Sequence, residues 1–355
     1  MLFISIFIFN CLIKNFLKLL NIYKLIIMSK CVVDEKTKYY LIPTLKWLKP
    51  IEPLIIEDTN TAGLLMIAKM VEKEKVIVKI SKGKNKKIRI IGIKLNNMYN
   101  FLTTYCSFSC LEDYSKITKK YKNSEYFCDN DGNKMITIEI MKKYSGSLNK
   151  LQNTLTTTQT TKILIQILYS LMEAFYKYGF IHEDLSLGNV LYKIKTKNEI
   201  IEYNLTKTRT QYENLLIGEI IPLISDYDKT ESYNKGIFEK YSEEPMINKI
   251  KGYNETITIL DSISKITQNI ILLIKNEKDK NFIKNQINEL FSSEKYEEYY
   301  RHTYKTLRDY VKGIKTYDEM IKDTFAICKE LINKIIQIFK NDKKFILIYD
   351  LVDNF

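Results

Sequence analysis

Arginine is scarce in this sequence, and its scarcity excludes one obvious use of the positive charge. The formal net charge is +13 over 355 residues, yet the only arginines are Arg89, Arg209, Arg301 and Arg308. Nucleic-acid sites depend on arginine for bidentate contacts to bases and phosphates. We therefore expect no dedicated nucleic-acid binding, and we attribute the excess of lysine to a biased, AT-rich genome.

Histidine and paired cysteine are also lacking, which argues against a zinc site or a disulfide framework. The chain has only two histidines, His182 and His302, and no CxxC pair among its six cysteines. Both kinds of site need clustered ligands or paired thiols. The thiols are therefore predicted to be reduced, as they are in a cytoplasmic, reducing compartment.

Glycine and proline are few, at 11 and 5 residues, while 45% of the chain is hydrophobic and 12% is aromatic. This composition excludes collagen-like and disordered proteins and predicts a packed globular core. The chain is also longer than the roughly 250 to 300 residues at which a single core splits. Two lobes, or one domain with an appendage, are expected.

An uninterrupted hydrophobic run is missing from residues 1–28, although this segment is mostly apolar. Lys14, Lys18 and Lys24 interrupt it, and no charged region precedes it. A membrane span needs about 20 nearly continuous apolar residues, and a secretory signal needs the charged region. Two interpretations remain, namely a membrane-associated amphipathic helix and an upstream extension with Met28 as the true start. Membrane contact is expected only if residues 1–28 are made.

The pattern along the rest of the chain predicts strands first and helices later. Short apolar runs lie between residues 38 and 80 and again at 136–141, which predicts a small antiparallel sheet. Residues 190–192 and 220–225 are expected to be strand partners across a polar, hairpin-like segment. Helical periodicity dominates from Asp261 onward. The predicted fold class is therefore α+β.

One helix is clearly marked before the central motif of the chain. Apolar residues recur at steps of three and four from Leu164 to Phe175. Threonines at 156–158 can cap the start of this helix, and Gly179 can adopt the left-handed conformation that ends one. The helix is thus expected to end just before His182.

Three short motifs follow one another along the chain. VIVK ends in Lys79 on a predicted strand, HEDLSLGN contains Asp184 and Asn189, and SDYD contains Asp226. In this order they resemble the strand lysine, the catalytic loop and the metal-binding DFG motif of eukaryotic-type protein kinases. The resemblance covers about residues 54 to 270. It implies a two-lobed kinase-like fold with a small sheet in the N-lobe and a mainly helical C-lobe.

The resemblance implies a role for each of these side chains, with ATP and Mg²⁺ as cofactors. Asp184 would accept or orient the proton of a substrate hydroxyl. Asn189 and Asp226 would hold the magnesium ions that bridge the ATP phosphates. Lys79 would contact the α- and β-phosphates, and His182 would support the loop structurally.

Other positions match the kinase pattern more loosely. Gly63 is the one glycine in the segment expected to cover the nucleotide. Residues 139–143, which include Glu139 and Met141, would form the hinge that binds adenine through backbone groups. Asp261 resembles the aspartate that braces the catalytic loop from a long helix.

The two aspartates of the motifs are unusually far apart in sequence, at positions 184 and 226. The resulting insertion, at about residues 193–219, resembles that of haspin-like kinases and of the serine/threonine kinases of giant DNA viruses, the latter more closely. The resemblance then implies an N-lobe at 38–142 and a C-lobe at 143–355.

Several departures from the kinase pattern bear on activity. The nucleotide-covering segment has one glycine in place of three. No acidic residue occurs between Glu74 and Glu112, where a helix normally supplies a glutamate to the strand lysine. Glu183 replaces the arginine that anchors an activation-loop phosphate, and Ser186 replaces the lysine that steadies the γ-phosphate. Tyr227 replaces the DFG phenylalanine, and the glycine after it is absent.

Three functions remain open at this point. All four residues with direct chemical roles are present, which favours a serine/threonine protein kinase that acts on an unknown protein substrate. The departures also allow a pseudokinase that serves as a binding scaffold. A small-molecule kinase of the aminoglycoside or choline kinase type is the third alternative, since HxDLxxGN suits those enzymes too.

Overall fold

The computed structural model describes residues 48–54, 63–70, 75–82, 91–111 except 93 and 97, 135–195, 200–201, 203, 215–216, 220–227, 230–232 and 256–340. The segment 1–28 and most of the predicted nucleotide-covering loop lie outside these residues. Internal contacts divide the chain into two compact units, Met1–Arg89 with Thr103–Lys143 and Ile90–Leu102 with Tyr144–Phe355.

The first unit contains a five-stranded antiparallel sheet in the order β1-β2-β3-β5-β4. The strands are β1 (Leu48–Leu54), β2 (Gly63–Met70), β3 (Lys75–Lys82), β4 (Thr104–Leu111) and β5 (Met135–Lys142). In β3, Val76, Val78 and Ile80 are fully buried, whereas Ile77 and Lys79 on the other face are half-buried. This alternation explains why the segment forms a strand with one face on a core.

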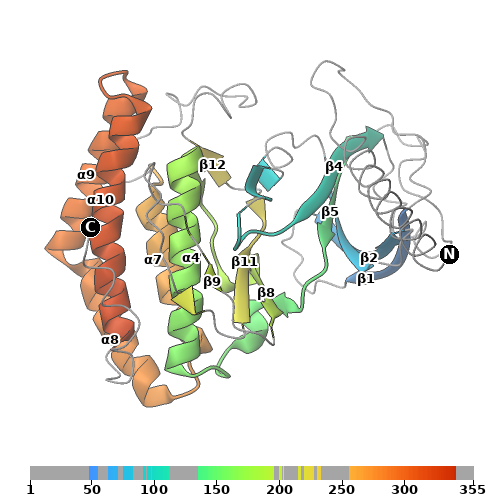
Figure 1. Ribbon diagram of the computed structural model, residues 1–355, viewed down its shortest axis with the longest axis horizontal. Coiled ribbons are helices and arrows are strands. Elements are labelled where there is room, and N and C mark those ends of the chain that lie inside the picture. The colour runs from blue at the N-terminus through green and yellow to red at the C-terminus, as the bar shows by residue number, and fades with distance from the viewer. Residues whose placement is uncertain are drawn as a thin grey trace, which may run out of the picture. The chain divides into compact units, whose positions relative to one another are not determined.

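The second unit is mainly helical (Figure 1). Its helices are α4 (Thr157–Tyr178), α7 (Ile259–Ile270), α8 (Glu277–Ser292), α9 (Glu294–Val311) and α10 (Tyr317–Phe339). Helix α4 begins at a capping box between Thr156 and Gln159 and ends at Gly179, which has a left-handed φ of 60°. The predicted start and end of this helix are therefore confirmed.

Helix α4 forms the centre of this unit's core. All residues from Ile163 to Phe175 are buried, so the helix is covered on every side and not only along one stripe. It contacts α7, α10 and strand β11 (Ile220–Ile224), and α10 in turn packs beside α9 (Figure 1).

Short strands frame the loops of the second unit. Strand β8 (Val190–Ile194) lies between β11 and β6 (Gly146–Ser147). β9 (Ile200–Ile201) and β10 (Leu215–Leu216) form a separate pair between β8 and β11 in the chain. The predicted partnership of residues 190–192 and 220–225 is confirmed, because β8 and β11 are antiparallel with Val190 opposite Ile224.

The predicted α+β class is confirmed by an antiparallel sheet that comes first and a mainly helical unit that follows. Among the helices that the structure describes, none combines the length and the apolar character needed to span a membrane.

Candidate active site

Two pairs of antiparallel strands bring the HEDLSLGN and SDYD motifs side by side. Strand β7 (Phe180–His182) leads into the first motif and β8 leaves it, whereas β11 leads into the second and β12 (Thr230–Ser232) follows it. β7 pairs with β12, and β8 pairs with β11. The two connecting loops, which carry Asp184 and Asp226, must therefore be neighbours.

Hydrogen bonds between the loops hold them in contact. Ser225 donates from its backbone N–H at 2.9 Å and from its hydroxyl at 2.8 Å to the Asn189 carbonyl oxygen. The side-chain amide of Asn189 donates to the Asp184 carbonyl oxygen at 2.7 Å. Asp184, Asn189 and the residue before Asp226 are thus joined through backbone groups.

His182 is fully buried and contacts both loops. Its Nε2 lies 2.8 Å from the Ser225 carbonyl oxygen, and its Nδ1 accepts the backbone N–H of Asp184 at 3.3 Å. Burial lowers the pKa of the imidazole, and the hydrogen bond to Ser225 opposes this only in part. The neutral ring therefore donates from Nε2 and accepts at Nδ1, which suits both contacts at once.

Asn189 and Asp226 are suited to hold a magnesium ion. Because the amide nitrogen of Asn189 donates to Asp184, its Oδ1 is the atom left for a ligand. Asp226 is half-buried and has a positive φ of 61°, which aspartate tolerates better than most residues.

Asn189 and Asp226 are too few to ligate a metal by themselves, but they suit magnesium, which takes its other ligands from phosphates and water. Magnesium commonly takes one or two carboxylates from the protein, while phosphates and water complete its octahedron. Within the described part of the chain, no three His, Cys, Asp or Glu side chains gather to form a metal site. Asn189 and Asp226 together match a metal that arrives with a nucleotide.

Lys265 of α7 also belongs to this site, although it lies in no motif. Its Nζ is 2.6 Å from Asp184 Oδ1, and the two side chains form an ion pair. The two residues are 81 positions apart, so sequence proximity gives no hint of the contact. The one available signal was helical spacing, since Lys265 lies one turn after Asp261.

Asp261 lies at the start of α7 and caps its own helix. Its Oδ2 accepts the backbone N–H of Thr258 at 2.6 Å and the Thr258 hydroxyl at 3.0 Å. Burial raises the pKa of this carboxyl group, and the bonds to Thr258 oppose the shift. The bracing contact expected of Asp261 is made by Ser262, whose hydroxyl donates to the His182 carbonyl oxygen at 2.8 Å.

Tyr227, which occupies the position of the kinase phenylalanine, packs in an aromatic cluster. Its ring centroid lies 6.5 Å from that of Phe101, 6.3 Å from that of Phe180 and 6.5 Å from that of His182. Its hydroxyl donates to the Ile224 carbonyl oxygen at 2.9 Å, so the additional polar atom is satisfied in a buried place. Tyr227 thus provides aromatic packing after Asp226, as the kinase pattern expects of a phenylalanine at this position.

In the first unit, the residues predicted to bind ATP share one face of the sheet. Lys79 in β3 is directly opposite Glu139 in β5. The register also places Met141 of β5 and Gly63 of β2 on this face. Opposite residues of antiparallel strands point to the same side, as do alternate residues of one strand. The sheet therefore gathers all four residues, which lie far apart in sequence.

Glu139 lies inside β5, where a hinge is not expected. Strand β5 has β3 on one side and β4 on the other, so the backbone groups of Glu139 point to neighbouring strands. Met141 is likewise paired on both sides, with Ile77 and with Thr104, so the predicted adenine contact through backbone groups stays a prediction for the end of the predicted hinge, where β5 stops at Lys142. The side chain of Glu139 is 4% exposed and lies across from Lys79. An acidic residue therefore stands beside the strand lysine, from a strand and not from the following helix.

A buried polar network centred on Asn100 connects the predicted insertion to the strand before Asp226. Asn100 Nδ2 donates to the Pro222 carbonyl oxygen of β11 at 2.8 Å. Its Oδ1 accepts the hydroxyls of Ser170 in α4, at 3.0 Å, and of Tyr203, at 2.5 Å. Tyr203 belongs to the insertion and is only 1% exposed. Tyr203 is thereby linked through Asn100 to α4 and β11.

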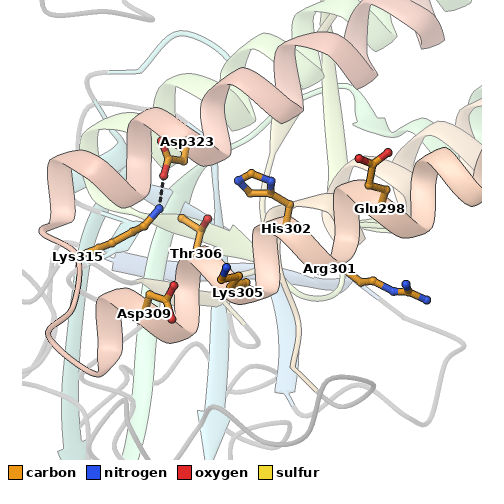
Figure 2. A pocket seen from close by; sticks show the side chains of 8 residues that line it. All are labelled: Glu298, Arg301, His302, Lys305, Thr306, Asp309, Lys315 and Asp323. Atoms are coloured by element: carbon orange, nitrogen blue, oxygen red, sulfur yellow. Dashed lines mark hydrogen bonds and ion pairs between the residues drawn. The ribbon is translucent and has the colours of Figure 1, made fainter.

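A separate pocket is lined by α9 and by residues at and near the start of α10 (Figure 2). Its charged side chains are of both signs and are balanced, since Lys315 is ion-paired with Asp323, and the lining also holds Arg301 and Lys305 together with Glu298 and Asp309. The pocket contains none of the predicted site residues, and balanced charge indicates no particular class of ligand.

Comparisons with known proteins add little to this geometry. No protein-family model matches the sequence, and no curated protein matches it. Among solved structures, the chain is similar to the PK-1 kinase of Cydia pomonella granulovirus, with 16% sequence identity and a TM-score of 0.39. That similarity covers 79% of this chain and 96% of the granulovirus chain. It is weak in sequence and in backbone position, so the functional interpretation rests on the residues of this chain.

Proposed function

We propose that this chain is an ATP-dependent phosphotransferase that acts as a serine/threonine protein kinase. The observation that supports this most strongly is the pairing of β7 with β12 and of β8 with β11. These pairs set the Asp184 and Asn189 loop beside Asp226. Phosphoryl transfer needs this arrangement, because the acceptor hydroxyl and the metal-bound phosphates must meet at one place.

Each residue has surroundings that suit its proposed task. The Asp184 side chain is 35% exposed, so an acceptor hydroxyl can reach it and pass its proton to the carboxylate. Asn189 Oδ1 and the Asp226 carboxylate would hold magnesium, which when bound neutralises charge on the ATP phosphates. Lys79, half-buried on its face of the sheet, would contact the α- and β-phosphates as a point charge.

The pseudokinase alternative rests on the departures from the kinase motifs. For two of these departures, another residue of this chain can take over the role. The acid missing from the helix after β3 has a counterpart in Glu139, which lies opposite Lys79. The aromatic packing of the DFG phenylalanine is provided by Tyr227. These two observations favour an active enzyme over a scaffold.

We also propose that the chain groups with haspin-like and giant-virus kinases through its long insertion. The insertion separates β8 from β11 in the chain, and within it Tyr203 is buried and donates its hydroxyl to Asn100. The protein substrate would be an unknown intracellular protein, and membrane contact would depend on residues 1–28.

The proposal is tested by giving the full-length protein γ-labelled ATP and magnesium with three kinds of acceptor. These are a mixture of serine- and threonine-containing peptides, an aminoglycoside, and choline. Label on peptide serine or threonine is the expected result. Label on the aminoglycoside or on choline would instead establish the small-molecule alternative.

Nucleotide binding separates an inactive scaffold from a protein with another function. If no acceptor is labelled but ATP with magnesium raises the melting temperature, the pseudokinase alternative holds. If the melting temperature is also unaffected by the nucleotide, neither form of the proposal stands.

A further inference from the structure

The catalytic loop contains no lysine or arginine, yet a cation lies against its aspartate. Within HEDLSLGN, Ser186 occupies the position where the kinase pattern has a lysine. The structure places the ammonium group of Lys265 2.6 Å from Asp184 Oδ1. This lysine comes from α7, a different element, and its presence at the loop calls for a physical explanation.

The position of Lys265 is fixed by the way α7 is attached to the loop. Ser262, one turn before Lys265 on the same helix face, donates its hydroxyl to the His182 carbonyl oxygen at 2.8 Å. The helix start is itself fixed by the capping box of Thr258 and Asp261. The backbone of α7 is thus aligned with the loop, and the lysine reaches Asp184 from a defined direction.

The ion pair between Lys265 and Asp184 is not explained by a contribution to folding stability. The side chains of Lys265 and Asp184 are 41% and 35% exposed, and ion pairs with such access to water contribute little to folding. The same exposure leaves both charged groups within reach of a ligand. An ammonium group has three N–H donors, so one bond to Asp184 leaves two for other oxygen atoms.

We propose that Lys265 supplies the positive charge that the loop lacks at Ser186, and that it binds the γ-phosphoryl group during transfer. This inference rests on the proposed phosphotransferase function. In the step, the acceptor hydroxyl oxygen bonds to the γ-phosphorus, and its proton passes to Asp184. The bond from phosphorus to the β–γ bridging oxygen breaks, and ADP leaves with the electron pair. Lys265 stabilises the charge on the transferring group and keeps Asp184 oriented.

The decisive experiment tests whether a lysine at position 186 of the loop can replace the positive charge of Lys265 on α7. Four full-length variants are compared with wild type: Lys265→Met, Lys265→Arg, the double variant Lys265→Met with Ser186→Lys, and Lys284→Met. Lys284 is an exposed residue of α8 outside the site and serves as a matched control. The hydroxyl of Ser186 makes no side-chain cap contact at the start of its 3₁₀ turn, so its replacement there breaks no capping bond.

The expected rates distinguish a role for the charge of Lys265 from a purely structural role of this residue. Lys265→Met should lower kcat roughly 10- to 100-fold with a smaller change in KM for ATP, because the charge acts mainly on the transition state. Lys265→Arg should lose less, the double variant should recover much of the rate, and Lys284→Met should match wild type. Recovery by a charge at residue 186 is an effect that a merely structural role for Lys265 would not produce.

Three results would overturn the inference while leaving the proposed function in place. The first is wild-type kcat in Lys265→Met, and the second is a faster rate, which would mean that Lys265 blocks Asp184. The third is a loss in Lys265→Met that the double variant does not recover at all, provided the melting temperatures match. A silent wild type would instead remove the proposed function, and this inference with it.

Discussion

At the scale of single residues, one buried side chain, His182, contacts both loops of the site. The His182 ring contacts the segment before Asp226 through Nε2 and the Asp184 backbone through Nδ1. Only a neutral imidazole can donate from one nitrogen and accept at the other. The protonation state of one buried ring therefore affects how both loops are held.

The stability of the protein should consequently fall as His182 becomes protonated. Burial lowers the pKa of His182 in the folded state below the value of about 6.5 expected in the unfolded chain. The unfolded chain then binds more protons below about pH 6.5, so the stabilising contribution is complete above that pH and is lost as the pH falls. Urea unfolding between about pH 7.5 and about pH 5.5 should show a slope of up to about 1.4 kcal/mol per pH unit from this group. His182→Gln should be less stable throughout and should show a smaller slope, and an unchanged slope would contradict the assignment.

Asp226 has a positive φ and a carboxylate that is predicted to bind metal. A substitution to asparagine removes the charge of the carboxylate while the backbone conformation remains tolerated. Asparagine also tolerates a positive φ, so Asp226→Asn should fold like wild type. It lacks the negative charge that a magnesium ion prefers. We expect it to lose most of the magnesium-dependent part of the rise in melting temperature that ATP causes. An undiminished magnesium-dependent rise would show that Asp226 is not a metal ligand.

At the scale of elements, the pairing of β3 with β5 explains how Lys79 can be oriented without an acid in the following helix. Glu139 is directly opposite Lys79, and such pairs have Cβ atoms about 4.5 to 5.5 Å apart. Glu139 is almost fully buried, and a buried carboxylate needs compensation by charge or hydrogen bonds. The two strands thus place complementary charges on one face of the sheet.

Removal of the charge at Glu139 should therefore weaken nucleotide binding. A favourable cross-strand charge pair contributes up to about 1 kcal/mol, so Glu139→Gln should raise KM for ATP up to roughly fivefold. Glu294→Gln, at an exposed position of α9, is the matched control. Equal values of KM in Glu139→Gln and wild type would show that Glu139 does not orient Lys79.

Tyr203 is also best understood at the scale of elements, because Asn100 links it to α4 and β11. Tyr203→Phe retains the ring, which packs 5.7 Å from that of Tyr169, but removes the hydrogen bond to Asn100. The free energy of unfolding should fall by about 1 to 2 kcal/mol, since a buried acceptor loses a partner. Tyr176→Phe, whose ring contacts Phe325, provides the control and should change stability little. Similar stability of the two variants would show that the hydroxyl of Tyr203 is not an anchor.

At the scale of the whole molecule, much of the fold followed from local signals in the sequence. The period of two in β3 and the threonine and glycine at the ends of α4 are properties of a few neighbouring residues. The partnership of β8 and β11 was also predictable, because both are short apolar runs on either side of a polar segment. The α+β class needed no more than these patterns.

Parts of the site could not be predicted because they depend on contacts between distant residues. Lys265 reaches Asp184 across 81 positions, and the only local signal was that Lys265 lies one helical turn after Asp261. The facing of Lys79 and Glu139 depends on the register of β5 against β3, which a sequence pattern does not fix. The support expected of Asp261 is provided by Ser262, a shift of one residue that follows from the capping geometry of α7.

The central claim for the molecule is that Asp184 accepts the proton in a phosphoryl transfer from ATP. The most direct measurement is the rate at which full-length protein transfers the γ-phosphate to a peptide hydroxyl with saturating ATP and magnesium, in wild type and in Asp184→Asn. Asp318→Asn, at an exposed position of α10, controls for the loss of a carboxylate. The account predicts a fall of at least about 100-fold in Asp184→Asn and none in the control. A wild-type rate in Asp184→Asn would contradict it.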